Sequence, residues 1–134
     1  MVEIENKLKK KNSIFQNKNY LLIGSKHKGE YILKERIVYV EAYENYSWLH
    51  LSNGTKHLSC KSIGYYQEQL IQDGFLRIHR SYLINLSHLK LYEPKYRLVH
   101  LKKELVLPVS FRRNRTLSKE IENQTVQLPY RIAV

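Results

Sequence analysis

The stretch FLRIHRSYLINL, residues 75–86, places basic side chains inside a run of apolar ones. The apolar side chains need a core, whereas Arg77, His79 and Arg80 need water or an anionic partner. The basic side chains therefore either reach out of a purely structural segment into solvent, or lie where the protein holds its ligand. The elements and charges around the stretch decide between these two interpretations.

Strands are predicted on the N-terminal side of this stretch. Residues 20–24 and 31–42 are rich in Tyr, Ile, Val and Leu, the residue types that favour strands. Alternating apolar and polar residues on both sides of Asn53 and Gly54 predict a hairpin over residues 47–59. We expect a type I′ turn there, because Asn-Gly tolerates positive φ at both central positions.

A helix is predicted between this hairpin and residue 75. Ile63, Tyr66 and Leu70 lie at positions i, i+3 and i+7, which places them on one helical face. Ser62 is a suitable N-cap, and Gly74 follows the expected end of the helix.

The C-terminal side is also predicted to form strands. Leu89 and Leu91 are followed by a predicted turn at residues 92–95, where proline supplies the fixed φ, and residues 96–101 and 104–109 come on either side of a polar turn at Lys102 and Lys103, the second of them as the last strand. Ser110 can cap a short basic helix that runs to Ile121. The chain therefore divides into a basic N-terminal arm (1–19), a strand-rich domain (20–121) and a C-terminal tail (122–134).

The positive charge of the chain is concentrated in its second half. The formal net charge is +11, from 23 Lys and Arg against 12 Asp and Glu. Residues 20–74 are electroneutral, whereas residues 75–115 hold ten basic and two acidic residues, a net charge of +8. A cluster of this kind is typical of a surface that binds a polyanion. Nucleic acid is the leading partner class, and an anionic membrane surface is the second.

The sequence favours no enzyme class. It contains no Gly-rich phosphate loop, no H-E-x-x-H and no G-x-S-x-G. His57 and Cys60 lack a second pair of metal ligands, so we expect no metal and no cofactor. A single cysteine cannot form an internal disulfide, and no apolar run approaches the length of a spanning helix. The expected location is therefore the cytoplasm.

Arginine residues are the best candidates for ligand contact. The basic clusters contain Arg77, His79 and Arg80, the lysine pair at 102 and 103, and Arg112, Arg113 and Arg115. For the lysine pair, a solvated surface is the favoured interpretation. Arg80 and Arg112 each lie where an apolar element meets a polar loop, and a guanidinium can bind guanine bidentately or clamp a phosphate.

Three further side chains could approach a phosphate. His79 either donates to a phosphate or orders a turn. Lys61 and Ser62 lie at the start of the predicted helix, where free amides and the positive end of the helix dipole attract anions. Eleven tyrosines also allow base stacking on a single strand. Tyr46 is a candidate because residues 43–47 lie between a predicted strand and the predicted hairpin, where a side chain can project.

The chain resembles the LytTR-type DNA-binding domain of bacterial transcriptional regulators over about residues 20–117. The resemblance rests on three blocks in the expected order: E-A-x-x-N-Y (41–46), F-x-R-x-H-R-S-Y-L-x-N (75–85) and L-P-V-S (107–110). It implies a mostly β fold, an elongated arrangement of antiparallel β-sheets with one or two short helices. It also implies that loops, rather than a recognition helix, enter successive major grooves.

The family resemblance assigns base contacts to three loops. Carried over by motif, these contacts are Asn45, Tyr46 and Ser47 in the first loop, Arg80 in the second and Arg112 in the third. The position after Ser110 is often arginine in the family and is Phe111 here. This departure shifts the chemistry of the third loop toward Arg112 and Arg113.

These observations predict a sequence-specific, double-stranded DNA-binding transcriptional regulator, which would act as a response-regulator output domain. The alternative is a single-stranded RNA or DNA binder that uses tyrosine stacking. By resemblance, we expect repeated half-sites and a homodimer on DNA. Nineteen residues cannot encode a receiver domain, so we expect either a stand-alone regulator with a separate signalling partner or a fragment of a larger protein.

Overall fold

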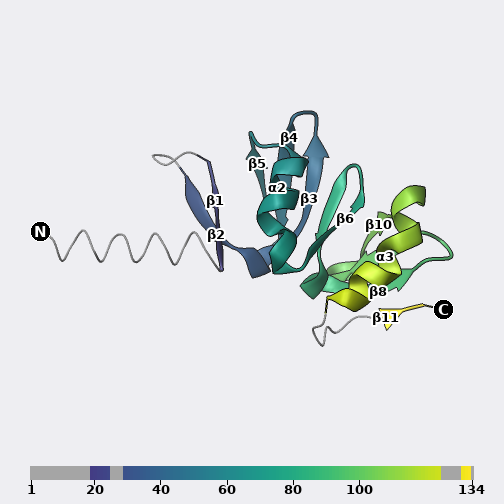
Figure 1. Ribbon diagram of the computed structural model, residues 1–134. Coiled ribbons are helices and arrows are strands. Elements are labelled where there is room, and N and C mark those ends of the chain that lie inside the picture. Colours follow the sequence, from purple (N-terminus) through teal and green to yellow (C-terminus); the bar gives the residue numbers. More distant parts are fainter. Residues whose placement is uncertain (1–18, 25–28, 125–130, 134) are drawn as a thin grey trace, which may run out of the picture.

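Three β-sheets lie in a row and form an elongated molecule (Figure 1). The computed structural model describes residues 19–24, 29–124 and 131–133. A small N-terminal hairpin is followed by a five-stranded sheet and then by a four-stranded sheet, with one helix on each of the larger sheets. The mostly β fold with two short helices that the sequence predicted is therefore confirmed.

The quoted stretch forms two neighbouring strands of the five-stranded sheet. The strand order is β5–β4–β3–β7–β6, and every neighbouring pair is antiparallel. Residues 75–86 supply β6, a tight turn, β7 and the first residue of a 3-10 segment. The bounds are β3 (Ile37–Tyr43), β4 (Tyr46–Leu51), β5 (Lys56–Ser59), β6 (Phe75–His79) and β7 (Tyr82–Asn85).

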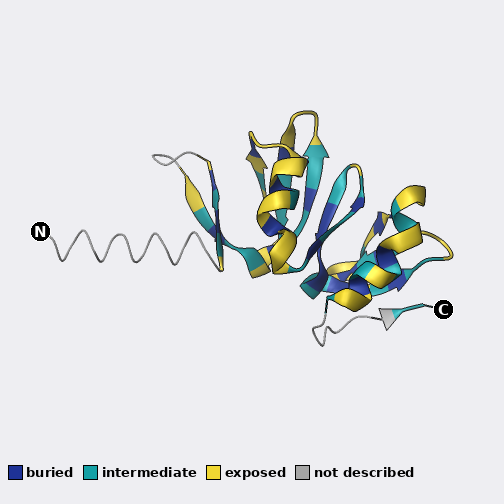
Figure 2. Ribbon diagram, in the orientation of Figure 1, coloured by how far each residue is buried: buried dark blue, intermediate teal, exposed yellow. Residues whose placement is uncertain are grey.

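The five-stranded sheet is buried on both faces where β3, β6 and β7 lie. Leu83 packs into one core and Ile84 into the other, and neither is accessible to solvent. Successive side chains of a strand point to opposite faces, so a strand between two cores carries consecutive apolar residues. This position explains the dense apolar pattern of the quoted stretch, and Figure 2 shows the buried residues on the strands between the outer elements.

The first core lies beneath the N-terminal hairpin and helix α2. The hairpin consists of β1 (Tyr20–Ile23) and β2 (Glu30–Leu33), and α2 spans Ile63–Leu70. The buried side chains of the helix are Ile63, Tyr66 and Leu70, the three that the sequence placed on one face. The hydroxyl groups of Tyr66 and Ser59 are hydrogen-bonded within this core.

The second core lies between the five-stranded sheet, the four-stranded sheet and helix α3. The four-stranded sheet has the order β10–β9–β8–β11, in which β11 pairs parallel with β8 and the other pairs are antiparallel. Leu117 and Ile121 of α3 are buried, as predicted. The bounds are β8 (Leu89–Glu93), β9 (Leu98–Leu101), β10 (Leu105–Pro108), α3 (Phe111–Asn123) and β11 (Arg131–Ile132). The turn predicted at residues 92–95 lies at 94–97 instead, because Tyr92 and Glu93 still pair with β9.

The C-terminal tail contains structure that the sequence did not indicate. Helix α3 continues two residues past Ile121, and β11 adds an edge strand after it. A two-residue strand is too short to leave a pattern in the sequence. Residues 125–130, like most of the predicted N-terminal arm (1–18), lie outside the described residues.

Short 3-10 segments connect several of these elements. They are η1 (Lys34–Arg36), η2 (Ile71–Asp73), η3 (Leu86–His88) and η4 (Lys102–Glu104). Segment η2 continues α2 to Gly74, whose φ of 79° ends the helix in the left-handed conformation that glycine favours. Ser62 and Ser110 cap α2 and α3, because each hydroxyl accepts a hydrogen bond from the amide three residues later.

The β4–β5 hairpin is confirmed, but its predicted turn type is wrong. Gly54 has a φ of 88°, whereas Asn53 is not among the residues with positive φ. The Gly54 amide donates to the carbonyl of Leu51, and the Leu51 amide donates to the carbonyl of Thr55. This pattern is a three-residue loop with glycine at the left-handed position. The Asn53 side chain accepts hydrogen bonds from Thr55, which stabilises this alternative.

No helix among the described residues is long and apolar enough to cross a membrane.

Candidate nucleic-acid interface

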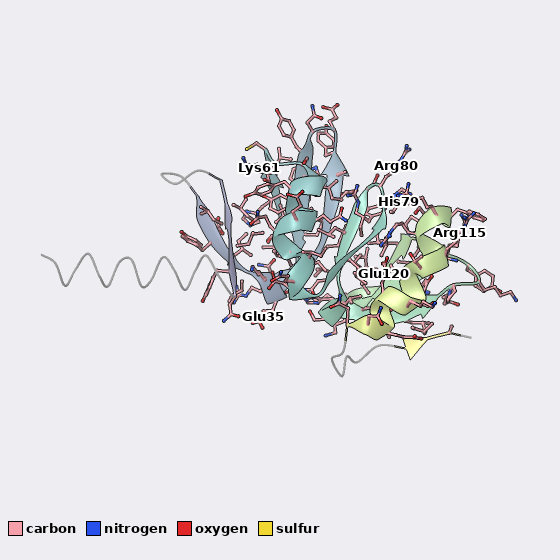
Figure 3. All side chains as sticks on the ribbon, viewed as in Figure 1. Glu35, Lys61, His79, Arg80, Arg115 and Glu120 are labelled. Atoms are coloured by element: carbon pink, nitrogen blue, oxygen red, sulfur yellow. The ribbon has the colours of Figure 1, made fainter. Side chains whose placement is uncertain are left out.

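The predicted contact residues gather at one end of the five-stranded sheet. Strands β3, β5 and β6 run in the same direction, because each is separated from the next by one antiparallel neighbour. The segments that follow these three strands therefore lie at the same end of the sheet. Figure 3 shows Lys61 and Arg80 at this end of the five-stranded sheet and Glu35 at the opposite end of its strands.

Hydrogen bonds join the segments at this end of the sheet into one surface. The Ala42 amide at the end of β3 donates to the carbonyl of Ser81 (2.9 Å). The Ser110 amide, just before α3, donates to the carbonyl of Ile78 in β6 (2.9 Å). The first and third predicted loops are thus both fixed to the β6–β7 hairpin, which carries the second. We call this surface, formed by residues 43–46, 60–62, 79–81 and 110–115, the loop edge.

The first predicted loop divides between exposed and buried residues. Glu44 and Asn45 form the two-residue turn between β3 and β4, with Glu44 at a φ of 54°. Asn45 is exposed, and Tyr46 exposes 44% of its surface. Tyr43, which the sequence did not single out, exposes 52% and lies opposite Tyr46. These side chains are free to meet a large ligand.

Ser47, the third residue predicted in this loop, faces the other way. It is inaccessible to solvent, because the alternation of β4 turns it toward the first core. Its hydroxyl donates to the carbonyl of Lys61 (2.8 Å). Ser47 therefore ties the first loop to the segment before α2, instead of presenting a group to a ligand.

The segment before α2 presents a lysine at a helix start. Lys61 is exposed, and its ammonium lies 5.2 Å from the ring centre of Tyr65. Ser62 is also exposed, but its hydroxyl is occupied as the N-cap of α2. The sequence placed both residues at this helix start. Because the Ser62 hydroxyl is used as the cap, Lys61 is the better candidate for contact with a ligand.

Arg80 lies at the tip of the β6–β7 hairpin, where Arg80 and Ser81 form the turn. Its side chain is exposed. The turn follows a register shift at Ile78, which pairs His79 with Tyr82. Because Ile78 is buried in the second core, the hairpin is anchored two residues before Arg80.

The Arg77 guanidinium stabilises this turn by hydrogen bonds to its backbone. Its Nε donates to the carbonyl of His79 (2.8 Å), and one Nη donates to the carbonyl of Arg80 (2.5 Å). The other Nη donates to the side-chain oxygen of Gln67 in α2 (2.8 Å). The structure therefore gives Arg77 a positioning role. The sequence did not indicate Gln67, because its contact depends on how α2 packs over β6.

His79 orders the same turn. Its Nδ1 accepts a hydrogen bond from the Ser81 amide (3.0 Å), which requires an unprotonated Nδ1. Burial, followed by the charges of Arg80 and Arg77, lowers the pKa of His79 and favours the neutral ring. A neutral imidazole that accepts at Nδ1 carries its proton on Nε2. That N–H can still donate to a phosphate, so both predicted roles are compatible.

The third predicted contact segment forms the first turns of helix α3 rather than a loop, and it also separates one exposed arginine from one anchored arginine. Arg112 is exposed on the first turn of α3. Arg113 turns inward, where its Nε donates to the carbonyl of Arg77 (2.8 Å) and an Nη donates to Glu120 (2.5 Å). Arg115 is exposed near the end of the loop edge (Figure 3). Arg113 therefore fixes α3 to the strand that carries Arg77.

The eleven predicted residues thus fall into two groups. Asn45, Tyr46, Lys61, Arg80, Arg112 and Arg115 are exposed, and they present polar, aromatic or cationic groups. The remaining five make hydrogen bonds that fix the loops: Ser47, Ser62, Arg77, His79 and Arg113. Within the described part of the chain, no three His, Cys, Asp or Glu residues lie close enough to hold a metal ion.

Comparisons with known proteins place the chain in a family. The family model of the LytTr DNA-binding domain matches residues 27–122. A solved LytTr DNA-binding domain from Bacillus cereus, assigned to a methyl-accepting/DNA response regulator, has a TM-score of 0.63 and 18% sequence identity. The match covers 82% of this chain and 100% of that chain. No match was found among curated proteins. The family match covers most of the chain and all three predicted loops, and the protein therefore belongs to the LytTR family of DNA-binding domains that regulate transcription.

Proposed function

We propose that this protein is a sequence-specific transcriptional regulator that reads bases in the major groove of double-stranded DNA through the loop edge. The proposal rests on the position and support of Arg80. Its side chain is exposed at a hairpin tip whose backbone carbonyl is bound from inside by Arg77. An arginine held in this way can enter a groove in a fixed orientation, which base recognition requires.

Arg80 and Arg112 are the proposed base readers. Each can donate two parallel hydrogen bonds to O6 and N7 of guanine, which is the commonest specific contact in the major groove. The two arginines lie on segments that are hydrogen-bonded to each other through Ser110 and Ile78. Asn45, on the first loop, is the third proposed reader, because an asparagine amide matches N6 and N7 of adenine.

The other exposed cations are the proposed phosphate contacts. Lys61 and Arg115 lie on the same edge as the proposed base readers, and a lysine or arginine binds phosphate without regard to sequence. The Nε2–H of His79 is a further proposed donor to a phosphate. This division assigns sequence selectivity to three residues and affinity to the others.

A second candidate function rests on Tyr43 and Tyr46. Both rings are exposed at the tip of the β3–β4 hairpin, 52% and 44% respectively, and exposed aromatic rings can stack on unpaired bases. Such a protein would bind single strands better than duplexes. Competition between a duplex and its separated strands discriminates between the two candidates, and we expect the duplex to compete better.

Partners and location follow from the proposed function. Regulators of this kind occupy repeated sites when two copies bind side by side, so we propose a homodimer on DNA with repeated half-sites. A signalling partner that supplies the input, and a cytoplasmic location where the protein meets DNA, complete the proposal.

Selection of bound sequences from a pool of random duplexes tests the proposed function. The selection is done at near-physiological salt, because low salt increases binding that does not depend on sequence. We expect a recurrent sequence that contains guanines at the positions that Arg80 and Arg112 contact. Recovery of no recurrent sequence would overturn the proposal that the protein is a specific regulator.

A further inference from the structure

A cationic and aromatic surface extends beyond the loop edge, at the turn between β8 and β9. Phe111 exposes 66% of its surface and Tyr96 exposes 61%, and these are the two most exposed large apolar side chains among the described residues. Lys95, Arg97 and Arg115 lie next to these rings and are also exposed. We call these five residues the flanking patch.

The flanking patch is fixed to the helix that carries Arg112. The Arg97 amide donates to the carbonyl of Pro94 (3.2 Å), which closes the turn. The side-chain amide of Asn114 in α3 donates to the same carbonyl (3.1 Å). The Val109 amide donates to the carbonyl of Arg97 (2.8 Å). Because the turn is bound to α3 and to the residue that follows β10, it keeps a fixed position relative to Arg112.

The charges of the patch are all positive and stand close together. The guanidinium carbons of Arg97 and Arg115 lie 5.4 Å and 5.5 Å from the ring centre of Phe111. The ammonium of Lys95 lies 5.6 Å from the ring centre of Tyr96. Residues 94–97 and 111–115 contain five Lys or Arg and no acidic residue.

The aromatic rings explain how these cations are held, and their charge indicates what they bind. A ring face attracts a cation, which restrains its side chain without consuming its N–H donors. Guanidinium groups held near one another with their donors free are suited to an anion that offers several oxygen atoms. A row of phosphates has this chemistry.

The patch adjoins the loop edge. A surface hollow of about 390 Å³ is lined by His79 of the loop edge, by Tyr96 and Arg97 of the patch, and by Phe111, which belongs to both. A duplex whose groove receives Arg80 and Arg112 would therefore extend toward the β8–β9 turn. The ligand that fits both surfaces is one continuous polyanion.

We propose that the flanking patch is a second DNA contact, which binds the phosphates of the duplex beside the base pairs read by the loop edge. This inference rests on the proposed function for its orientation, but the contact itself does not depend on base sequence. Lys95 and Arg97 supply charge, Arg115 links the patch to the loop edge, and the Tyr96 hydroxyl can donate to a phosphate.

Salt dependence tests the flanking contact directly. The variant Lys95→Gln/Arg97→Gln removes two charges but keeps the backbone hydrogen bonds of the turn. Lys90→Gln/Lys102→Gln is the matched control, because both lysines are exposed and lie outside the patch. The probe is a random-sequence duplex of about 30 base pairs, which is long enough for both surfaces. Circular dichroism during heating confirms that each variant is folded.

We expect the patch variant to make the slope of log affinity against log salt less steep by about one to two units, and the control to leave it nearly unchanged. Equal slopes for the two variants would overturn the flanking contact, and an acidic protein would then be the better candidate partner for the patch.

A second readout separates this inference from the proposed function. The patch variant should lower affinity for a selected sequence and for random DNA by the same factor, so that discrimination between them is unchanged. If no sequence is selected, the proposed function fails, while the salt slopes still decide whether the patch binds DNA. A loss of discrimination in the patch variant would overturn its assignment as a phosphate contact.

Discussion

The guanidinium of Arg77 donates a hydrogen bond to the carbonyl oxygen of Arg80 at 2.5 Å. The two arginines therefore have different roles. Arg77 contributes its side chain to the geometry of the hairpin tip, and Arg80 contributes its side chain to the surface. The same division recurs between Arg113, which is bound to Glu120 and to the carbonyl of Arg77, and the exposed Arg112.

Arg77→Lys should reduce DNA discrimination although it keeps the positive charge. A lysine cannot bridge the carbonyls of His79 and Arg80 and also reach Gln67, because it lacks the planar fork of the guanidinium. We expect a loss of about 1–2 kcal/mol in unfolding free energy and a lower affinity ratio between selected and random duplexes. Gln67→Ala, which removes one of the three acceptors, should have a smaller effect. Unchanged discrimination in Arg77→Lys would show that the turn does not need this support.

Stability should fall in mildly acidic solution through His79. Burial and two nearby arginines lower the pKa of His79, so the unfolded chain binds the proton more readily than the folded protein. The contribution of the neutral ring is therefore complete above the unfolded pKa of about 6.5, and it is lost as the pH falls below that value toward the lowered pKa.

His79→Asn is the matched variant for this effect. An asparagine oxygen can still accept the hydrogen bond from the Ser81 amide, but it does not titrate. The difference in unfolding free energy between the two proteins, measured by urea denaturation from pH 8 down to about pH 5, should be constant above the unfolded pKa and change below it. Parallel curves over the whole range would exclude His79 as the cause, since the other histidines are common to both proteins.

Ser47→Ala should destabilise the protein and loosen the first loop. The substitution removes the hydrogen bond to the carbonyl of Lys61 at a site with no solvent access, which costs about 1 kcal/mol or more. Ser52→Ala, in the half-buried β4–β5 loop, is the control and should cost less. Chemical denaturation gives both values. A loss of DNA affinity in Ser47→Ala with no loss of stability would instead indicate a direct contact.

Both faces of β7 should be equally sensitive to truncation. Leu83 and Ile84 are adjacent in sequence, inaccessible to solvent and packed into different cores. Leu83→Ala and Ile84→Ala should each cost about 2–5 kcal/mol. Leu58→Ala, at a side chain that is 50% exposed, should cost much less. If either β7 substitution had only the effect of the control, that face of the sheet would not be buried in solution.

Local signals made much of this fold predictable. The two serine caps, the glycine after α2 and the apolar face of α2 depend on residues within a few positions of one another, and the structure confirms each of them. The type I′ turn predicted at Asn53 and Gly54 is wrong, because the Asn53 side chain stabilises a different turn by accepting a hydrogen bond from Thr55. The edge strand β11 depends on β8, forty residues earlier, and no local pattern indicates it.

The separation of anchored from exposed residues could not be predicted. Arg77 and Arg80 are both arginines in one short run, and only the register shift at Ile78 and the packing of α2 decide which guanidinium turns inward. Ser47 follows Tyr46 directly, yet the alternation of β4 buries it. The flanking patch joins residues of the β8–β9 turn with residues of helix α3, so its charges appear in the sequence as unrelated clusters.

The measurement that tests base reading most directly is the affinity of Arg80→Ala for two duplexes of equal length and composition, one with the selected sequence and one shuffled. Arg36→Ala, which removes an exposed arginine from segment η1, is the control. Arg80→Ala should lose about 1–3 kcal/mol of discrimination between the two duplexes, because the bidentate contact to a base is lost. Arg36→Ala should keep the wild-type ratio. An equal loss of affinity on both duplexes in Arg80→Ala, with the ratio unchanged, would contradict base reading by Arg80 and make it a phosphate contact.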